Sequence, residues 1–265
     1  MIRWTVLLLL FLVSCAPPIG VNDPLPIDGN QPYIIDKGDE QGVLLIHGLS
    51  ATPWEVTPIA NYLAQRNVTV VVTLLAGHGT TMAELNSATW PEWYASANDS
   101  LTILKHKTQR VYVAGVSAGA DVAVLLAANN ELDGLILMAP PIEFQDPRAK
   151  FARAYQYILP YASHVVTLEE QGHYYPYIPS HSVAELNDMI SHVKTALPRV
   201  TEPTLILQSI HDKTIKPASA DFVFRNIGSK QKELRLYGNA SHVLVQEQDA
   251  PDIIFYSVGQ FLDQN

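Results

Sequence analysis

Short, continuous runs of apolar residues alternate along most of this chain with stretches that place apolar residues at helical spacing. Examples of the runs are GVLLIHG (42–48), RVYVAGV (110–116) and TLILQS (204–209). A strand that is apolar at every position belongs in a sheet covered on both faces, as parallel sheets are. Its alternation with helices indicates parallel crossovers. The pattern therefore predicts an α/β fold with a doubly wound, mostly parallel sheet.

The expected elements fill one domain, which we place at 33–265. The strands expected are 42–48, 68–75, 110–116, 132–140, 204–209 and 233–237. The helices expected are 58–66, 90–107, 118–128, 218–227 and 251–263. A chain of 265 residues is within the range of a single α/β domain with an insertion. Its 48% hydrophobic content is enough to bury a sizeable core.

One stretch, residues 141–198, breaks the alternation. No convincing strand pattern lies between Pro140 and Pro203. Six of the 12 tyrosines gather there: Tyr155, Tyr157, Tyr161, Tyr174, Tyr175 and Tyr177. We predict a mainly helical insertion that sits as a cap over the sheet. The alternative is a set of ordinary helices that use aromatic residues as core filler.

The N-terminus, residues 1–14, has the pattern of a targeting segment. A basic start at Arg3 precedes the apolar run WTVLLLLFLV (4–13). Ten residues are too few to span the ~30 Å hydrocarbon core, so a signal peptide is the better interpretation. The run ends in LVSC, and Cys15 is the only cysteine of the chain. A free thiol near an ordinary cleavage site is the alternative.

LVSC resembles the lipobox of bacterial lipoprotein signals, which implies cleavage before Cys15 and a diacylglyceryl group on its sulfur. Two or more acyl chains anchor a protein stably. Residues 15–32 are rich in proline and predict an extended tether. The expected location is therefore outside the cytoplasm on a membrane. Ala16, in place of the aspartate that retains lipoproteins at an inner membrane, favours an outer membrane where the cell has one.

The charge balance excludes one class of partner. Seventeen basic and 26 acidic residues give a formal net charge of −9, with no basic tract. Such a chain is a poor candidate for binding nucleic acid or polyanionic substrates.

The motif Gly115-Val116-Ser117-Ala118-Gly119 carries the chemistry. G-x-S-x-G marks a nucleophilic serine when a strand precedes it and a helix follows, and this sequence supplies both. Ser117 would then project from the carboxyl end of a strand, where ligands bind in open α/β sheets. Its hydroxyl needs a neighbouring base to become a strong nucleophile.

We assign the base to His242 and the acid that orients it to Asp212. His242 follows the last expected strand, and Asp212 follows the strand 204–209. The chain order serine, aspartate, histidine matches that of the α/β-hydrolases and differs from the orders of two protease classes on other folds. The rival acids sit less well: Asp133 precedes a strand, Asp221 lies in a helix, and Asp146 and Asp188 lie in the cap.

An oxyanion hole needs two backbone N–H groups, one after the nucleophile and one in the loop after an early strand. Ala118 supplies the first, and Leu49, in LLIHGLSATP, is the expected second. His47 is expected to hold that loop through hydrogen bonds, and His78 to shape the pocket rim.

Five segments together resemble bacterial carboxylesterases of the monoacylglycerol-lipase type. They are LLIHGLSATPWEVTPIANYL, AGHGTT, VAGVSAGA, IHDKTI and ASHVLVQEQDAPDIIFYSVGQFL, within Gly42 to Leu262. The resemblance implies an α/β-hydrolase fold, the same three catalytic residues and the same two oxyanion donors. Ala120 departs from the usual glycine of that family and Leu49 from its frequent phenylalanine, and neither change removes a catalytic group.

We therefore expect a serine hydrolase that cleaves short- to medium-chain acyl esters or monoacylglycerols through an acyl-enzyme. No cofactor is expected, and the histidines of the cap (His164, His173, His181 and His192) lack the spacing of a zinc site. The alternatives are a non-catalytic lipid-anchored protein that binds an apolar ligand, and thioesterase, peptidase or acyltransferase activity on the same residues. The oligomeric state stays open.

Overall fold

A computed structural model describes residues 29–164, 171–246 and 251–265. The predicted signal peptide, the lipidation of Cys15 and the tether up to residue 28 lie outside these described residues. No helix in the described part of the chain has the length and apolar character needed to cross a bilayer.

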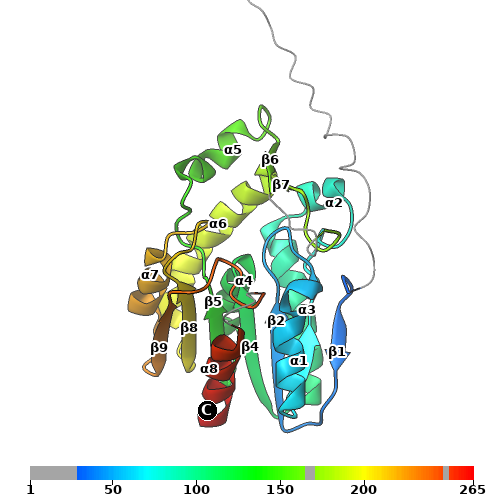
Figure 1. Ribbon diagram of the computed structural model, residues 1–265, viewed down its shortest axis with the longest axis vertical. Helices are drawn as coiled ribbons and strands as arrows, with labels where there is room; N and C mark the ends of the chain where they lie inside the picture. The colour runs from blue at the N-terminus through cyan, green and yellow to red at the C-terminus, as the bar shows by residue number, and fades with distance from the viewer. Residues whose placement is uncertain (1–28, 165–170, 247–250) are drawn as a thin grey trace, which may run out of the picture.

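A seven-stranded sheet runs through the centre of the molecule (Figure 1). Its strands, in the spatial order of the sheet, are β1 (Tyr33–Ile35), β3 (Thr69–Val72), β2 (Gln41–Ile46), β4 (Arg110–Val116), β5 (Gly134–Met138), β8 (Thr204–Ser209) and β9 (Lys232–Tyr237). All neighbours pair in parallel except β1, which is antiparallel to β3. The α/β fold with a mostly parallel sheet is therefore confirmed.

Helices cover both faces of this sheet, as continuous apolar strands require. Along β2, Val43 and Leu45 join one core cluster with residues of α1 (Thr57–Gln65) and α8 (Pro251–Gln264). Leu44 and Ile46, which point to the other face, join a second cluster with residues of α3 (Trp90–Lys107), α4 (Ala118–Ala127) and α7 (Ala218–Asn226). Five of the six positions of the strand, residues 42–46, are buried because adjacent side chains meet different helices.

The segment between β5 and β8 extends beyond the carboxyl ends of the strands (Figure 1). We call residues 141–198 the cap segment. It contains η2 (Pro147–Phe151), α5 (Ala152–Tyr155), β6 (Tyr161–Ser163), β7 (Tyr177–Pro179) and α6 (Ser180–Ala196), and it ends within η3 (Leu197–Arg199). The long helix α6 also packs on the main core through Met189 and Val193.

Two features of the cap segment differ from the sequence expectation. The absence of strands was wrong, because β6 and β7 form a small antiparallel hairpin. Strands of three residues are too short to show a period of two, so the sequence pattern could not reveal them. The six tyrosines also differ in exposure: Tyr174 and Tyr175 are buried, Tyr157 is exposed, and the other three are half-buried. Aromatic packing and cap surface are therefore both present.

Candidate active site

Ser117 lies in the sharp turn between β4 and α4. Its φ of 51° and ψ of −120° are in a region that residues other than glycine rarely occupy. The Ser117 N–H donates to the Met138 carbonyl of β5 at 2.8 Å, which holds the turn against the sheet. Gly115 and Gly119 allow the turn, because a Cβ at either position would overlap a backbone carbonyl, that of Gly119 and that of Ile46 respectively.

Three residues from three loops meet at this turn. His242, which follows β9, places Nε2 2.9 Å from the Ser117 Oγ. Its other ring nitrogen, Nδ1, lies 2.7 Å from Oδ2 of Asp212, which follows β8. Because β4, β8 and β9 are parallel, their carboxyl ends share one edge of the sheet, and residues far apart in sequence come within hydrogen-bond distance.

Asp212 is buried and fully engaged in hydrogen bonds. Oδ1 accepts the N–H groups of Thr214 and Ile215, and Oδ2 accepts the Gln208 side-chain amide as well as His242. Burial, the largest single influence, raises the pKa of Asp212, but the bonds and charge of His242 and the two N–H groups outweigh it, so the pKa is lowered. The ionised carboxylate makes His242 Nδ1 the donor, which leaves Nε2 to accept from the serine hydroxyl.

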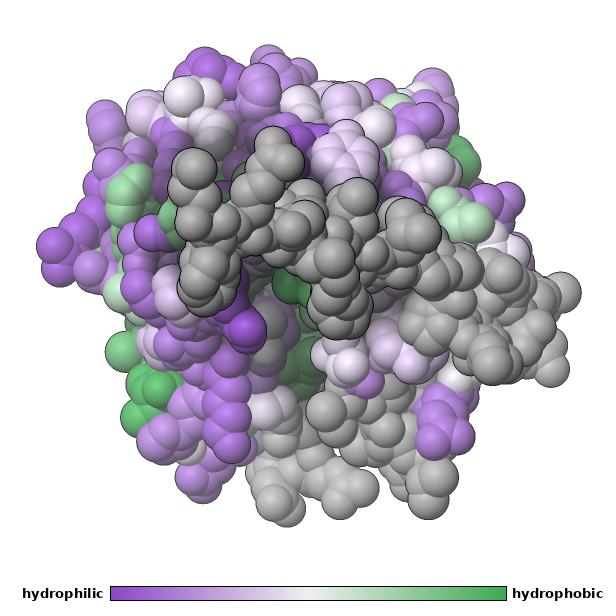
Figure 2. Space-filling view, turned by 90° about the horizontal axis from the view of Figure 1, so that it is seen from above, coloured by the Kyte–Doolittle hydropathy of each residue, from purple (hydrophilic) through white to green (hydrophobic). Residues whose placement is uncertain are grey.

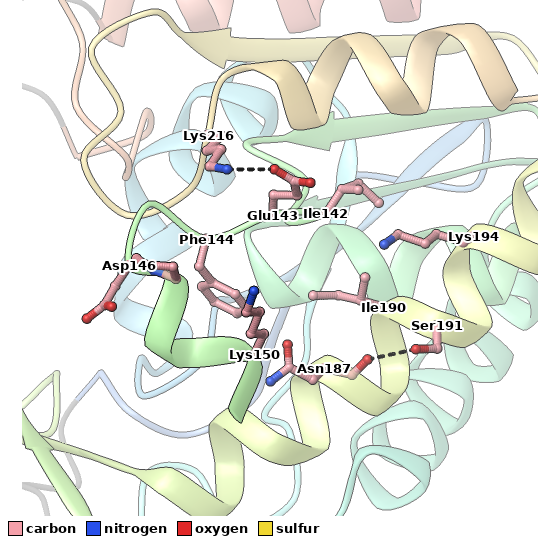
Figure 3. Close-up of a pocket in the computed structure, with 11 residues that line it drawn as sticks. Ile142, Glu143, Phe144, Asp146, Lys150, Asn187, Ile190, Ser191, Lys194 and Lys216 are labelled. Atoms are coloured by element: carbon pink, nitrogen blue, oxygen red, sulfur yellow. Dashed lines mark hydrogen bonds and ion pairs between the residues drawn. The ribbon is translucent and has the colours of Figure 1, made fainter. Parts of the chain in front are cut away.

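The segment after β5 supports the loop that carries Asp212. The Gln145 side chain donates to the Asp212 carbonyl at 2.9 Å, and the Gln145 N–H donates to Thr214. Lys216 pairs with Glu143 at 2.8 Å above a cavity of about 370 Å³ (Figure 3). The segment after β5 and the loop after β8 are thereby joined beside Asp212. Sequence patterns gave no signal for Gln145 or Gln208, since a glutamine carries no motif of its own.

The two predicted oxyanion donors flank Ser117. Ala118 is the first residue of α4, so its N–H has no partner within the helix. Leu49 lies in the loop after β2, and its N–H has no acceptor within the described part of the chain. The Gly48 carbonyl of the same peptide accepts the Ala51 N–H at 3.4 Å and contacts His47 Nδ1 at 2.9 Å. Since N–H and C=O point in opposite directions across a peptide, these bonds orient the Leu49 N–H.

His47 and His78 are buried side by side beneath this loop, with ring centroids 5.0 Å apart. The Leu75 N–H donates to His47 Nε2 at 3.1 Å, so Nδ1 carries the proton that binds the Gly48 carbonyl. Burial lowers the pKa of His47 to about 3 and that of His78 to about 4. Both rings are therefore neutral at pH 7, and His47 holds the loop through hydrogen bonds, as expected.

The rival acids bind elsewhere. Asp133 accepts the Val111 N–H, Asp146 pairs with Arg148, Asp188 with Arg153, and Asp221 with Arg225. None of the four approaches Ser117 or His242 in these contacts.

Two hollows of different character are present, one beside His242 and one on the cap segment. One, of about 460 Å³, is next to His242 and is lined by polar residues such as Lys213 and Asn239. The other, of about 740 Å³, runs along the cap segment and is lined mainly by apolar groups, among them Phe151, Tyr155 and Leu159. Seen from above, the described residues on this face are mostly hydrophilic, with hydrophobic residues in a central hollow and at the left and right margins (Figure 2).

Comparisons with known proteins show the family of the chain. The family model Hydrolase_4, described as serine aminopeptidase, S33, matches residues 39–249. A thermostable monoacylglycerol lipase of Bacillus sp. (strain H-257) is 28% identical over 239 residues, which cover 89% of this chain and 95% of that protein. A carboxylesterase of Bacillus subtilis (strain 168) is 24% identical over 237 residues, covering 86% of this chain and 94% of that protein.

The fold has close counterparts among solved structures. One, from a study of the metagenome-derived lipolytic enzymes LipS and LipT, superposes with a TM-score of 0.84 at 24% identity, covering 90% of this chain and 99% of that chain. The matched family model includes the serine turn, the acid loop and the histidine loop within one continuous range. The chain therefore belongs to the Hydrolase_4 (serine aminopeptidase, S33) family and is an α/β-hydrolase.

Proposed function

We propose that this protein is a serine hydrolase that cleaves carboxylic esters, with Ser117, His242 and Asp212 as its catalytic triad. The single observation that carries the proposal is the continuous set of hydrogen bonds Ser117 Oγ to His242 Nε2 (2.9 Å) and His242 Nδ1 to Asp212 (2.7 Å). Nucleophile, base and orienting acid at these distances are what acyl transfer requires. The names of the curated relatives, a monoacylglycerol lipase and a carboxylesterase, support ester substrates.

Acylation uses all three residues. The Ser117 Oγ attacks the ester carbonyl carbon while its proton passes to His242 Nε2, and Asp212 stabilises the resulting imidazolium. The carbonyl oxygen becomes an oxyanion, which the Leu49 and Ala118 N–H groups bind. When the tetrahedral intermediate collapses, the bond to the leaving oxygen breaks, and His242 returns the proton to the departing alcohol.

Deacylation repeats these steps with water as the nucleophile. His242 Nε2 accepts a proton from the water, whose oxygen attacks the acyl carbon. The same two N–H groups bind the second oxyanion, and the carboxylic acid leaves as His242 returns the proton to Ser117. No cofactor takes part in either half of this scheme.

The cap segment supports apolar acyl groups as the substrate class. Its hollow of about 740 Å³ is lined by Phe151, Tyr155 and Leu159, and it is large enough for a short or medium acyl chain. We propose short- to medium-chain esters or monoacylglycerols. An acyl-chain-length series measures this part: a flat profile of kcat/KM would contradict selection by the cap.

We also propose that the protein is exported and held on a membrane by a lipid on Cys15. The lone cysteine after the apolar run 4–13 supports this location. Metabolic labelling of the wild-type chain with a fatty acid, compared with Cys15→Ser, measures it. Equal labelling of both chains would contradict the anchor.

Replacement of Ser117 tests the triad. Ser117→Ala is expected to reduce kcat for p-nitrophenyl butyrate by about 10⁴-fold or more, because the remaining site lacks a nucleophile. Ser87→Ala, an exposed serine of α2 (Met82–Ser87), is the matched control and is expected to keep wild-type turnover. Wild-type turnover in Ser117→Ala would overturn the assignment.

A labelling experiment and two further substrates separate the alternative functions. A fluorophosphonate that fails to label wild-type Ser117 would favour a non-catalytic protein that binds an apolar ligand. Faster hydrolysis of an aminoacyl p-nitroanilide or an acyl thioester than of the butyrate ester would favour a peptidase or a thioesterase.

A further inference from the structure

A buried carboxylate, that of Glu55, lies against the loop that carries the oxyanion donor Leu49. Glu55 belongs to η1 (Pro53–Val56), and only 2% of its surface is exposed. Its Oε2 accepts the Gly48 N–H at 2.6 Å, and its Oε1 accepts the Tyr174 hydroxyl at 2.9 Å. Burial of a carboxylate is costly unless donors satisfy it, so a buried glutamate beside a proposed oxyanion hole calls for a role.

Contact with Gly48 couples Glu55 to the reacting serine. A Cβ added to Gly48 would lie 3.4 Å from Glu55 Oε2 and 3.4 Å from Ser117 Cβ, so this glycine is held between the two residues. Leu49 comes next in the chain. A shift of the Glu55 carboxylate therefore moves Gly48, and with it the peptide whose N–H is the Leu49 donor.

The Gly48 N–H and the Tyr174 hydroxyl both donate hydrogen bonds to Glu55. An ionised carboxylate only accepts, and hydrogen bonds to an ionised acceptor are shorter and stronger than neutral ones. The 2.6 Å bond from the Gly48 N–H fits that class. The Glu55 carboxylate, with one oxygen on the Gly48 N–H and the other on the Tyr174 hydroxyl, thus fixes Gly48 relative to the cap segment.

Tyr174 brings the cap segment into this contact. Its ring, 5% exposed, meets Trp54 edge-on with centroids 6.1 Å apart. The next residue, Tyr175, donates its N–H to the Ser50 carbonyl at 3.1 Å, and Trp54 stacks on His173 with centroids 4.6 Å apart. The cap therefore binds the loop of residues 48–50, which we call the oxyanion loop, on both sides of Leu49, through Glu55 and through Ser50.

We propose that Glu55 is a positioning residue for the oxyanion hole, and that Tyr174 holds it there on behalf of the cap segment. The inference rests on the proposed function, since it concerns the donor that stabilises the reacting ester. Its consequence is that the docked cap and the aligned Leu49 N–H depend on each other. A cap that lifts away releases the Tyr174 hydroxyl and loosens the donor.

Three single variants test this role by steady-state kinetics on p-nitrophenyl butyrate. Glu55→Ala is expected to lower kcat about 100-fold with KM little changed, because loss of one oxyanion donor costs that much in turnover. Glu55→Gln is expected to restore most of kcat: its oxygen accepts the Gly48 N–H, and its NH₂ donates to the Tyr174 oxygen. Tyr174→Phe, which removes one hydrogen bond, is expected to lower kcat about 3- to 10-fold.

A matched control separates positioning from general destabilisation. Glu185 of α6 is also buried, and its Oε2 accepts a backbone N–H, that of Trp90, at 3.2 Å. Glu185→Ala is therefore expected to reduce the unfolding midpoint as Glu55→Ala does, while kcat per folded molecule stays at the wild-type value. Circular dichroism gives the folded fraction of each variant.

A double variant tests whether Tyr174 acts through Glu55. In the Glu55→Ala background, Tyr174→Phe is expected to have no further effect on kcat, because the hydroxyl has lost the group it holds. Additive effects would show that Tyr174 acts by itself and would overturn that half of the inference.

The possible failures are distinguishable. If Ser117→Ala abolishes turnover while folded Glu55→Ala keeps the wild-type kcat, the positioning role is wrong and the proposed hydrolase function stands. A fall in kcat for Glu55→Gln as large as that for Glu55→Ala would also overturn the positioning role. If Ser117→Ala keeps wild-type turnover, the proposed function itself fails.

Discussion

At the scale of single residues, the site depends on a strained backbone at Ser117 and on glycines whose surroundings leave no room for a side chain. Ser117 has a positive φ of 51°, a conformation that costs of order 1–3 kcal/mol and persists only where surrounding contacts impose it. Those contacts are the Met138 carbonyl on the Ser117 N–H and the close approach of α4 to β2 at Gly119. Strain at Ser117, the proposed nucleophile, is thus supported by packing that only glycine permits.

Gly119→Ala tests that packing. The added Cβ would overlap the Ile46 carbonyl, a backbone atom that cannot turn aside. We expect the free energy of unfolding to fall by about 3 kcal/mol, as for other overpacked cores. Gly238→Ala is the control, since its Cβ would have no neighbour nearer than the Ile210 Cδ1 at 4.0 Å, and it should change stability by about 0.5 kcal/mol or less. Urea unfolding measures both, and equal effects would contradict the argument.

At the scale of elements, α4 follows Ser117, the proposed nucleophile, and contains a buried acid. All ten of its residues are buried, including Asp121 in its first turn. Among the described residues, neither Asp121 carboxylate oxygen has a hydrogen-bond partner. Burial raises the pKa of Asp121 well above its usual value, and the charge of Lys194 on α6 opposes this only in part. The folded helix therefore favours a protonated Asp121.

Asp121→Asn is expected to stabilise the protein at neutral pH. The raised pKa means that the folded chain keeps a proton that the unfolded chain releases above about pH 4, so stability is full below that pH. Between that pH and the pKa of Asp121 in the folded chain, the free energy of unfolding falls by about 1.4 kcal/mol for each pH unit. The asparagine variant lacks this loss. Urea unfolding at pH 4.5 and pH 7.5 should show a gain that grows with pH.

The control for this prediction is Asp221→Asn. Asp221 lies on the exposed side of α7 and pairs with Arg225 four residues later. Its removal is expected to change stability by only about 0.5 kcal/mol, as for other surface pairs. If Asp121→Asn destabilises equally at both pH values, the buried-acid argument is wrong.

At the scale of the whole molecule, the sheet holds a core on each face, and the loops at its carboxyl edge share buried polar groups. Gln246, after the histidine loop, donates its side-chain amide to the Glu55 carbonyl at 2.7 Å. His47 and His78 lie beneath the oxyanion loop, both neutral because burial lowers their pKa. Protonation of either ring would place a charge inside the molecule, so these histidines set an acid limit on the folded state.

The acid limit is measurable with His78→Gln. In the folded state the pKa of His78 is about 4, which is below its value in the unfolded chain, so the unfolded chain binds a proton first as pH falls. Stability from this group is full above about pH 6.5 and is lost by about 1.4 kcal/mol per pH unit below it. His78→Gln should flatten the slope of unfolding free energy between pH 4.5 and 6.5 by that amount. His106→Gln, at an exposed position of α3, should leave the slope unchanged. A slope equal to wild type in His78→Gln would contradict the prediction.

Elements whose pattern is long and periodic were predictable from the sequence. The strand 110–116 and the helix 90–107 were placed with their observed bounds, because continuous burial and helical spacing persist over enough residues to be recognised. The edge strand β1, the hairpin of β6 and β7, and the short helix α2 were not foreseen. Each has three to six residues, and tertiary contacts stabilise it.

The sequence by itself determined the parallel sheet, the turn at Ser117 and the order of Ser117, Asp212 and His242, because these depend on local periodicity and on residue types with distinctive chemistry. Only the tertiary structure decided how far apart they lie, that Gln208 and Gln145 support the acid, and that Glu55 and Tyr174 join the cap to the oxyanion loop. The physical reason is the same in each case: glutamine, glutamate and tyrosine are ordinary surface or core residues in a sequence. Their role arises when 119 residues of chain, from Glu55 to Tyr174, fold back to bring a hydroxyl to a buried carboxylate.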